Sequence, residues 1–308
     1  MKKIDKIYIA CCKRDFYFAK LCISSIRYWD INIPIELVID HAWGDVDTTY
    51  LEKHWGVKRF DCRYKIFKES YSKLEPLFEQ SGKRIFTMDS DIILLGNIVN
   101  ELEKIDSDFI CQKIYSTEDD ESLNAWWFDV EKLKKWDADY HFPGYAFYAG
   151  QLVTNEGIFL RENFKDILEF GNPPLLKQPV IFLNNADQGI LNYVVAKKVA
   201  DNKITIKDYP FFIGRYDSAV LKCLQVENVK AKKGRPEMIH YYGPKNGLLI
   251  NMPAENILRL YEKYYYQYYP HPALKYATDR FMRTIKNPFA FAKGLAKKIY
   301  KSLFILFF

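Results

Sequence analysis

The sequence lacks several features that would place a chain in a familiar class. None of its 308 positions begins an uninterrupted apolar stretch of about 18 residues, so we expect no membrane-spanning helix. The six cysteines form no Cys-x-x-Cys pair and no zinc-type Cys/His spacing. No signal peptide, internal repeat or low-complexity linker is recognisable. These absences exclude zinc-finger and repeat architectures, and they favour a cytoplasmic globular protein with reduced thiols in its core.

Acidic residues are missing from the last part of the chain. Residues 280–301 hold seven Lys or Arg, and no acid follows Asp279. Apolar residues recur there every three or four positions: Ala292, Ala296, Ile299, Leu303 and Leu306. This pattern predicts an amphipathic helix on an anionic membrane surface, with the tyrosines of 261–269 at headgroup depth. A helix docked on the core is the alternative. Nucleic acid is disfavoured as a partner, because the basic residues are confined to an apolar tail.

Nearly half of the residues are hydrophobic and 17% are aromatic, which is ample for a packed core. Strands and helices alternate along the chain, which predicts an α/β fold with a parallel, doubly wound sheet. The expected strands cover 6–12, 35–39, 85–88, 92–95 and 109–114, and the expected helices cover 16–29, 48–55, 71–80, 161–171 and 187–197. The segment 116–124 is polar and predicts a loop. We expect a catalytic domain over 1–255 and a membrane-associating tail over 256–308.

Two carboxylates follow the strand at 85–88. Asp89 and Asp91 flank Ser90 at its carboxyl end, and a second apolar run begins at Ile92. Buried carboxylates are paired or bound to a cation, and ligands of open α/β sheets bind where the strands end. Carboxylate oxygens there suit Mg²⁺ or Mn²⁺ held together with substrate phosphates. The alternative for an isolated Asp-x-Asp is a solvated turn.

Two later segments and two basic residues could complete such a site. Asp187 and Gln188 begin an apolar helix, where they either cap the helix or point into a cleft. His240, which is followed by Gly243 and Lys245, either is a structural histidine or completes a cation shell. The basic residues Lys73 and Arg84 either are ordinary surface charges or offset a phosphate.

These motifs, in this order, resemble glycosyltransferase family eight, the family of glycogenin and the lipopolysaccharide galactosyl- and glucosyltransferases. The basic residue five positions before Asp-x-Asp is matched by Arg84. Asp-Gln with a following Leu-Asn is matched by Asp187, Gln188, Leu191 and Asn192. The late His-x-x-Gly with a Lys is matched by His240, Gly243 and Lys245, and Tyr17 stands where the family places a base-stacking Tyr. The sequence departs from the family at Tyr148, where an Asn is usual.

The resemblance implies a GT-A fold, a Rossmann-like nucleotide-diphospho-sugar transferase fold with a mixed, mainly parallel sheet flanked by helices. It implies Mn²⁺ or Mg²⁺ on Asp89, Asp91 and His240. The residues expected at the donor are Tyr17, Lys73, Arg84, Ser90, Gly243 and Lys245. Gln188 would stabilise charge near the anomeric carbon, and Asp187 would bind sugar hydroxyls.

The implied reaction transfers a hexose, galactose or glucose, from a UDP-sugar with retention of configuration. The acceptor would be a lipid-linked, lipopolysaccharide or capsule glycan, which suits an enzyme held peripherally on the inner face of the cell membrane. An inverting GT-A transferase with Asp187 as base is one alternative. A non-catalytic nucleotide-sugar-binding relative is the other.

Overall fold

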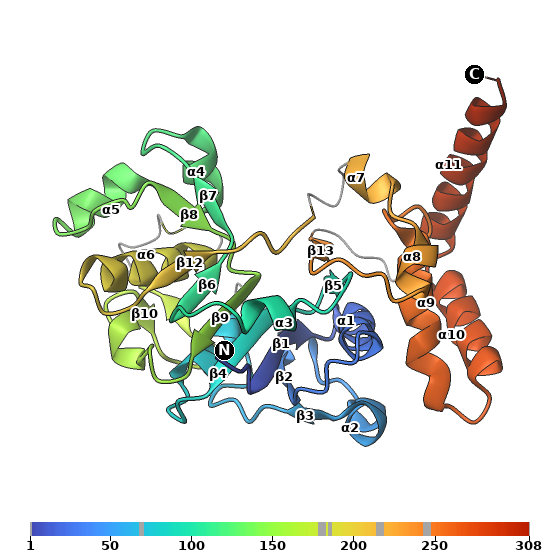
Figure 1. Cartoon of the computed structure of the whole chain (residues 1–308), viewed down its shortest axis with the longest axis horizontal. Coiled ribbons are helices and arrows are strands. Elements are labelled where there is room, and N and C mark those ends of the chain that lie inside the picture. Colours follow the sequence, from blue (N-terminus) through green and yellow to red (C-terminus); the bar gives the residue numbers. More distant parts are fainter. Residues whose placement is uncertain are drawn as a thin grey trace. The chain divides into compact units, whose positions relative to one another are not determined.

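The chain forms two compact units, each of which is assembled from several segments (Figure 1). The computed structural model describes residues 2–67, 71–177, 183, 187–213, 219–242 and 248–307, with backbone alone at 298 and 300–307. Unit 1 comprises Met1–Arg14, Ile33–Ser90 and Val99–Phe211. Unit 2 comprises Asp15–Asn32, Asp91–Ile98 and Phe212–Phe308.

A seven-stranded sheet forms the centre of unit 1, in the order β12-β6-β9-β4-β1-β2-β3. Its strands are β1 (Lys6–Cys12), β2 (Ile35–Asp40), β3 (Val57–Arg59), β4 (Arg84–Asp89), β6 (Phe109–Cys111), β9 (Gln151–Asn155) and β12 (Ile206–Asp208). Neighbouring strands are parallel except that β9 runs antiparallel to β4 and β6. The central strands read as apolar runs because both sheet faces are covered. The expected mixed, mainly parallel α/β sheet is confirmed.

One large buried cluster of unit 1 lies on one face of this sheet. It contains Tyr8, Ile85 and Leu152 from β1, β4 and β9, which point to the same side because side chains alternate along a strand. Against them pack the 3₁₀ helix η2 (Tyr71–Phe78) and helix α6 (Asp187–Ala200), whose apolar residues belong to the same buried cluster. This packing fixes the start of α6 near the carboxyl end of β4, where the expected site lies.

The other elements of unit 1 are short. They are η1 (His41–Trp43), α2 (Thr49–Trp55), α3 (Val99–Leu102), α4 (Glu121–Trp126), α5 (Val130–Trp136), η3 (Arg161–Phe164) and the strand pairs β7 (Lys113–Tyr115) with β8 (Tyr145–Phe147) and β10 (Leu168–Glu169) with β11 (Leu175–Leu176).

Two expectations about this part of the chain are wrong. The predicted loop 116–124 contains the start of α4, because the Asp120 carboxylate accepts a hydrogen bond from the Ser122 amide at 2.7 Å and caps the helix. The predicted helix 161–171 ends after one 3₁₀ turn, because Leu168 and Glu169 pair with β11 instead.

Unit 2 is built on the antiparallel pair β5 (Ile92–Leu94) and β13 (Met238–His240) and on helices α1 (Phe16–Tyr28) and α9 (Glu255–Tyr265). The Leu94 carbonyl accepts hydrogen bonds from the Tyr261 hydroxyl at 2.7 Å and the Trp29 indole at 3.2 Å. The segment after β5 lies very close to the segment before β13. A Cβ at Gly96 would lie 2.2 Å from the Arg235 carbonyl oxygen. Only glycine fits there.

The described residues of unit 2 also form the 3₁₀ turn η5 (Tyr266–Tyr268) and the helices α7 (Ala219–Lys222), α8 (Val226–Lys230), α10 (Pro272–Lys286) and α11 (Pro288–Phe307). Just beyond the expected division at residue 255, α9 buries Ile257, Leu258 and Tyr261 in unit 2, and the division itself stays a prediction. The expectation that the tyrosines of 261–269 lie at headgroup depth is wrong for Tyr261, Tyr265 and Tyr266, which are buried. Within the described residues, no helix combines the length and apolarity needed to cross a membrane.

Candidate functional site

The Asp-Ser-Asp turn follows β4 at the carboxyl end of the parallel strands, as the sequence predicts. Asp89 is the last residue of β4, and its amide donates to the Gly150 carbonyl at 2.8 Å. The Ser90 amide donates to the Ala10 carbonyl of β1 at 3.2 Å. Backbone bonds to both neighbouring strands therefore fix the turn at the sheet edge where open α/β folds bind ligands.

Lys73 joins the β4 carboxylate to the start of α6. Its ammonium lies 3.0 Å from an Asp89 oxygen and 2.6 Å from an Asp187 oxygen, and it also donates to the Ala149 carbonyl at 3.4 Å. Lys73 and Asp187 are both buried. Lys73 thus holds two carboxylates from distant segments in place, and it is not a surface charge.

Among the described residues, one ammonium, that of Lys73, contacts both carboxylates of this cluster. Burial raises the pKa of Asp187 to about 6; Lys73 opposes this rise and Asp89 adds to it. Burial lowers the pKa of Lys73, but the attraction of Asp187 and Asp89 outweighs it and holds the pKa above its usual value. The cluster therefore stays cationic at Lys73 and is poised to take up a proton at Asp187 near pH 6.

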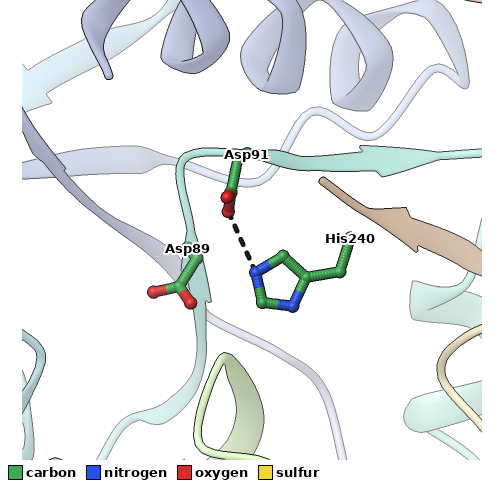
Figure 2. Close-up of side chains that lie close together, drawn as sticks. All are labelled: Asp89, Asp91 and His240. Carbon is green, nitrogen blue, oxygen red and sulfur yellow. Dashed lines mark ion pairs between the residues drawn. The ribbon is translucent and has the colours of Figure 1, made fainter. Parts of the chain in front are cut away.

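Asp91 and His240 face each other in unit 2 (Figure 2). Imidazole Nε2 lies 3.1 Å from an Asp91 carboxylate oxygen, and Asp91 is buried. The pairing of β5 with β13 produces this contact, because it aligns His240 with Ile92, and the Tyr241 amide donates to the Asp91 carbonyl at 3.0 Å. Asp89 precedes Asp91 by two positions, so the chain itself keeps their backbones within about 7 Å.

Gln188 is held by backbone groups on both sides. Its Nε2 donates to the Trp126 carbonyl at 2.9 Å, and its Oε1 accepts from the Ala149 amide at 3.5 Å. One turn later, Asn192 bonds both backbone groups of Phe147, accepting from the amide at 2.8 Å and donating to the carbonyl at 2.9 Å. The start of α6, the 147–150 segment and the end of α4 therefore form one hydrogen-bonded cluster around Gln188.

Tyr17 belongs to unit 2, on α1. Its hydroxyl donates to Glu262 at 2.7 Å, and the Arg283 guanidinium lies 4.4 Å from its ring centre. Burial and the Glu262 charge raise the pKa of Tyr17 well above its usual value. In this structure Tyr17 is therefore engaged by α9 and α10, and its stacking on a nucleobase stays a prediction.

Arg84 is not brought to the carboxylates. It starts β4, five residues of about 3.3 Å each from Asp89. Its guanidinium donates to the Ser107 carbonyl at 2.8 Å and to the Ile105 carbonyl at 3.2 Å. The basic residue that contacts Asp89 and Asp187 is Lys73. Gly243 and Lys245, predicted to bind the donor, lie outside the described residues.

Several of these roles leave no signal in the sequence. Lys73 lies among apolar residues at helical spacing, which indicates that this segment packs against the core. Nothing in the segment identifies Asp187 as the partner of Lys73. The contribution of Trp126 was missed because the segment before it reads as a polar loop. Local sequence patterns describe strands and turns, whereas these contacts join segments far apart in the chain.

Two solved glycosyltransferases share the fold of this chain. No protein-family model matches the sequence, and no curated protein is similar to it in sequence. The bifunctional glycosyltransferase WbbM superposes with a TM-score of 0.56 and 17% identity over 91% of this chain and 52% of WbbM. GlyE of Streptococcus pneumoniae gives a TM-score of 0.51 and 14% identity over 90% of this chain and 64% of GlyE. The chain thus spans about half the length of WbbM. The fold expected from the sequence is confirmed, and membership of family eight stays a prediction.

Proposed function

We propose that this protein is a metal-dependent glycosyltransferase that moves a hexose from a UDP-sugar to a glycan acceptor. The observation that carries the proposal is the turn at the end of β4, whose two carboxylates have separate partners. Asp89 pairs with Lys73, and Asp91 pairs with His240. The fold shared with WbbM and GlyE supports the same reaction class.

A divalent cation suits the side chains around the turn. Asp89, Asp91 and His240 would hold Mn²⁺ or Mg²⁺, because carboxylate oxygens and an imidazole nitrogen are ligands that Mn²⁺ accepts. Bound there, the cation offsets the charge that develops on a departing diphosphate. Asp91 and His240 already face each other at hydrogen-bond distance. His240 could therefore bind the cation without a rearrangement of β13.

Gln188 and Asp187 are the proposed reaction-centre residues. The Trp126 and Ala149 backbone groups orient the Gln188 amide, which would stabilise positive charge near the anomeric carbon. An amide is a poor nucleophile, so we favour retention by internal return, with the leaving phosphate taking the acceptor proton. Asp187, held by Lys73, would accept hydrogen bonds from sugar hydroxyls.

The inverting alternative has one observation in its favour. Burial raises the pKa of Asp187 to about 6, which is suitable for a general base near neutral pH. The anomeric configuration of the product, read by proton NMR from the first turnovers, separates the two reactions. An α-linked product from an α-linked donor supports retention, whereas a β-linked product assigns Asp187 as the base.

The acceptor is proposed to be lipid-linked, with the protein held peripherally on the cytoplasmic face of the membrane. Helix α10 has no buried residue, and Leu274, Phe281 and Ile285 lie exposed along one side at helical spacing. Phe289 and Leu295 of α11 are exposed as well. Apolar residues beside lysines and arginines suit an anionic lipid surface.

Donor hydrolysis tests the proposal most cheaply. Purified protein is incubated with UDP-glucose, UDP-galactose and a panel of other nucleotide sugars, with Mn²⁺ or with a chelator. Slow, Mn²⁺-dependent release of nucleotide from one donor is expected. If no nucleotide is released, and no nucleotide with Mn²⁺ raises the melting temperature, the proposal is wrong. Binding without turnover would instead indicate a non-catalytic relative.

A further inference from the structure

An exposed indole adjoins the side chain placed at the proposed reaction centre. Trp126 is the last residue of α4 and is 59% exposed. Its own carbonyl accepts the hydrogen bond from Gln188 Nε2 at 2.9 Å. Because the indole is covalently tied to that carbonyl, it lies within reach of one sugar ring from the Gln188 amide.

The end of α4 is held firmly in unit 1. The next residue, Trp127, is buried, and its indole donates to the Phe147 carbonyl at 2.8 Å. The same carbonyl accepts from Asn192 of α6 at 2.9 Å. Trp126 is therefore an exposed side chain next to a buried, hydrogen-bonded residue, which lowers the entropy cost of binding against it.

The charges near Trp126 select the kind of ligand. The preceding residues 118–121 are all acidic, so a nucleotide phosphate or an anionic lipid headgroup would be repelled there. A neutral pyranose would not be. One face of a pyranose carries aliphatic C–H groups, which match the electron-rich face of an indole, and the ring hydroxyls remain free to hydrogen-bond.

We propose that Trp126 is the platform on which the acceptor sugar stacks, beside Gln188. The inference rests on the proposed glycosyl transfer but assigns a separate subsite, for the neutral sugar that receives the hexose. Its indole would fix the plane of the acceptor ring and so determine which hydroxyl is presented for transfer.

Fluorine NMR tests this subsite without requiring turnover. The protein is labelled with 5-fluorotryptophan at its six tryptophans, and the Trp126 and Trp43 signals are assigned with Trp126→Phe and Trp43→Phe. Methyl β-D-glucopyranoside and methyl β-D-galactopyranoside are titrated in the presence of UDP and Mn²⁺. We expect a saturable shift of the Trp126 signal. Trp43 is the matched control, since it is similarly exposed, at 57%, and has no place in the proposed acceptor subsite. No shift at Trp126, or equal shifts at both, would overturn the inference.

Steady-state kinetics with the donor identified by hydrolysis provide a second test of this subsite. Trp126→Ala is expected to raise the KM for the methyl glycoside acceptor about tenfold or more, and Trp126→Phe to restore most of the loss. Trp43→Ala should leave this KM unchanged. A wild-type acceptor KM in Trp126→Ala would overturn this inference alone, whereas failure of the wild type to hydrolyse any donor would count against the proposed function instead.

Discussion

At the residue scale, the site depends on a lysine that contacts two of its carboxylates. Lys73 is the ammonium that the structure places against both Asp89 and Asp187, and it is buried with Asp187. Removing one partner of a buried ion pair leaves the other charge uncompensated, which costs far more than breaking a surface pair. Lys73 is therefore expected to set both the stability and the pH dependence of this cluster.

Replacing Lys73 by Met should make the protein sensitive to alkaline pH. Because the pKa of Asp187 is raised, its contribution to stability is present at low pH and is lost as pH rises through about 6. Without Lys73 that pKa rises further, so the variant should lose about 3 kcal/mol of unfolding free energy at pH 8 and much less at pH 5. Urea unfolding at the two pH values measures this.

Lys73→Met should also shift the pH dependence of donor hydrolysis. If Asp187 acts as a carboxylate, donor hydrolysis by the wild type falls as pH drops through about 6, and in the variant this fall moves to higher pH. Lys165→Met is the control, because Lys165 is an exposed residue paired with Glu162 on the surface. A variant that is destabilised equally at both pH values would contradict the assigned role of Lys73.

The sequence identified individual candidate site residues better than it identified the contacts between them. Asp89 and Asp91 could be placed because a strand, a turn and a second apolar run are local patterns, and His240 because a family motif repeats its spacing. The Lys73–Asp187 pair could not be predicted, since it joins η2 to α6, which lie more than 100 residues apart in the sequence. Arg84 begins β4 and binds the Ser107 carbonyl, and its predicted role at the donor stays a prediction.

At the scale of elements, helix α9 decides where the folded core ends. The sequence suggested a tail from residue 256, because aromatic and basic residues accumulate there. The structure instead buries the apolar side of α9 against α1, and the Tyr261 hydroxyl bonds the Leu94 carbonyl of β5. Periodicity alone cannot separate a docked helix from a membrane-surface helix, because both are amphipathic. Helix α10, with no buried residue, is the first element with the character of the expected tail.

Two leucines test this boundary. Leu258 of α9 is fully buried, whereas Leu274 of α10 is 66% exposed. Leu258→Ala should lower the unfolding free energy by about 3 kcal/mol, because it leaves a cavity beneath α9. Leu274→Ala should change it by less than about 0.5 kcal/mol. Equal effects of the two substitutions in chemical denaturation would mean that α9 is not part of the core.

At the scale of the whole molecule, the exposed face of α10 and α11 is expected to bind membranes. The protein should co-sediment with vesicles that contain anionic phosphatidylglycerol and much less with pure phosphatidylcholine, and added salt should weaken the binding. The double substitution Phe281→Asp and Phe289→Asp removes two exposed aromatic residues and should weaken binding at least about tenfold.

The matched control for vesicle binding is Leu160→Asp, which changes an exposed apolar residue of unit 1. It should bind vesicles like the wild type. If the double variant also binds like the wild type, the α10–α11 face is not the membrane surface, and the acceptor need not be lipid-linked.

The most direct test of the central claim compares Asp91→Asn with Asp106→Asn, an exposed surface carboxylate, in nucleotide-sugar hydrolysis and in the melting-temperature shift caused by UDP with Mn²⁺. Wild type and Asp106→Asn should release nucleotide only with Mn²⁺ and should be stabilised by it, because a ligand that binds the folded state raises its stability. Asp91→Asn should lose about 100-fold or more in rate, together with the shift. Hydrolysis that survives in Asp91→Asn or in chelator would contradict the account.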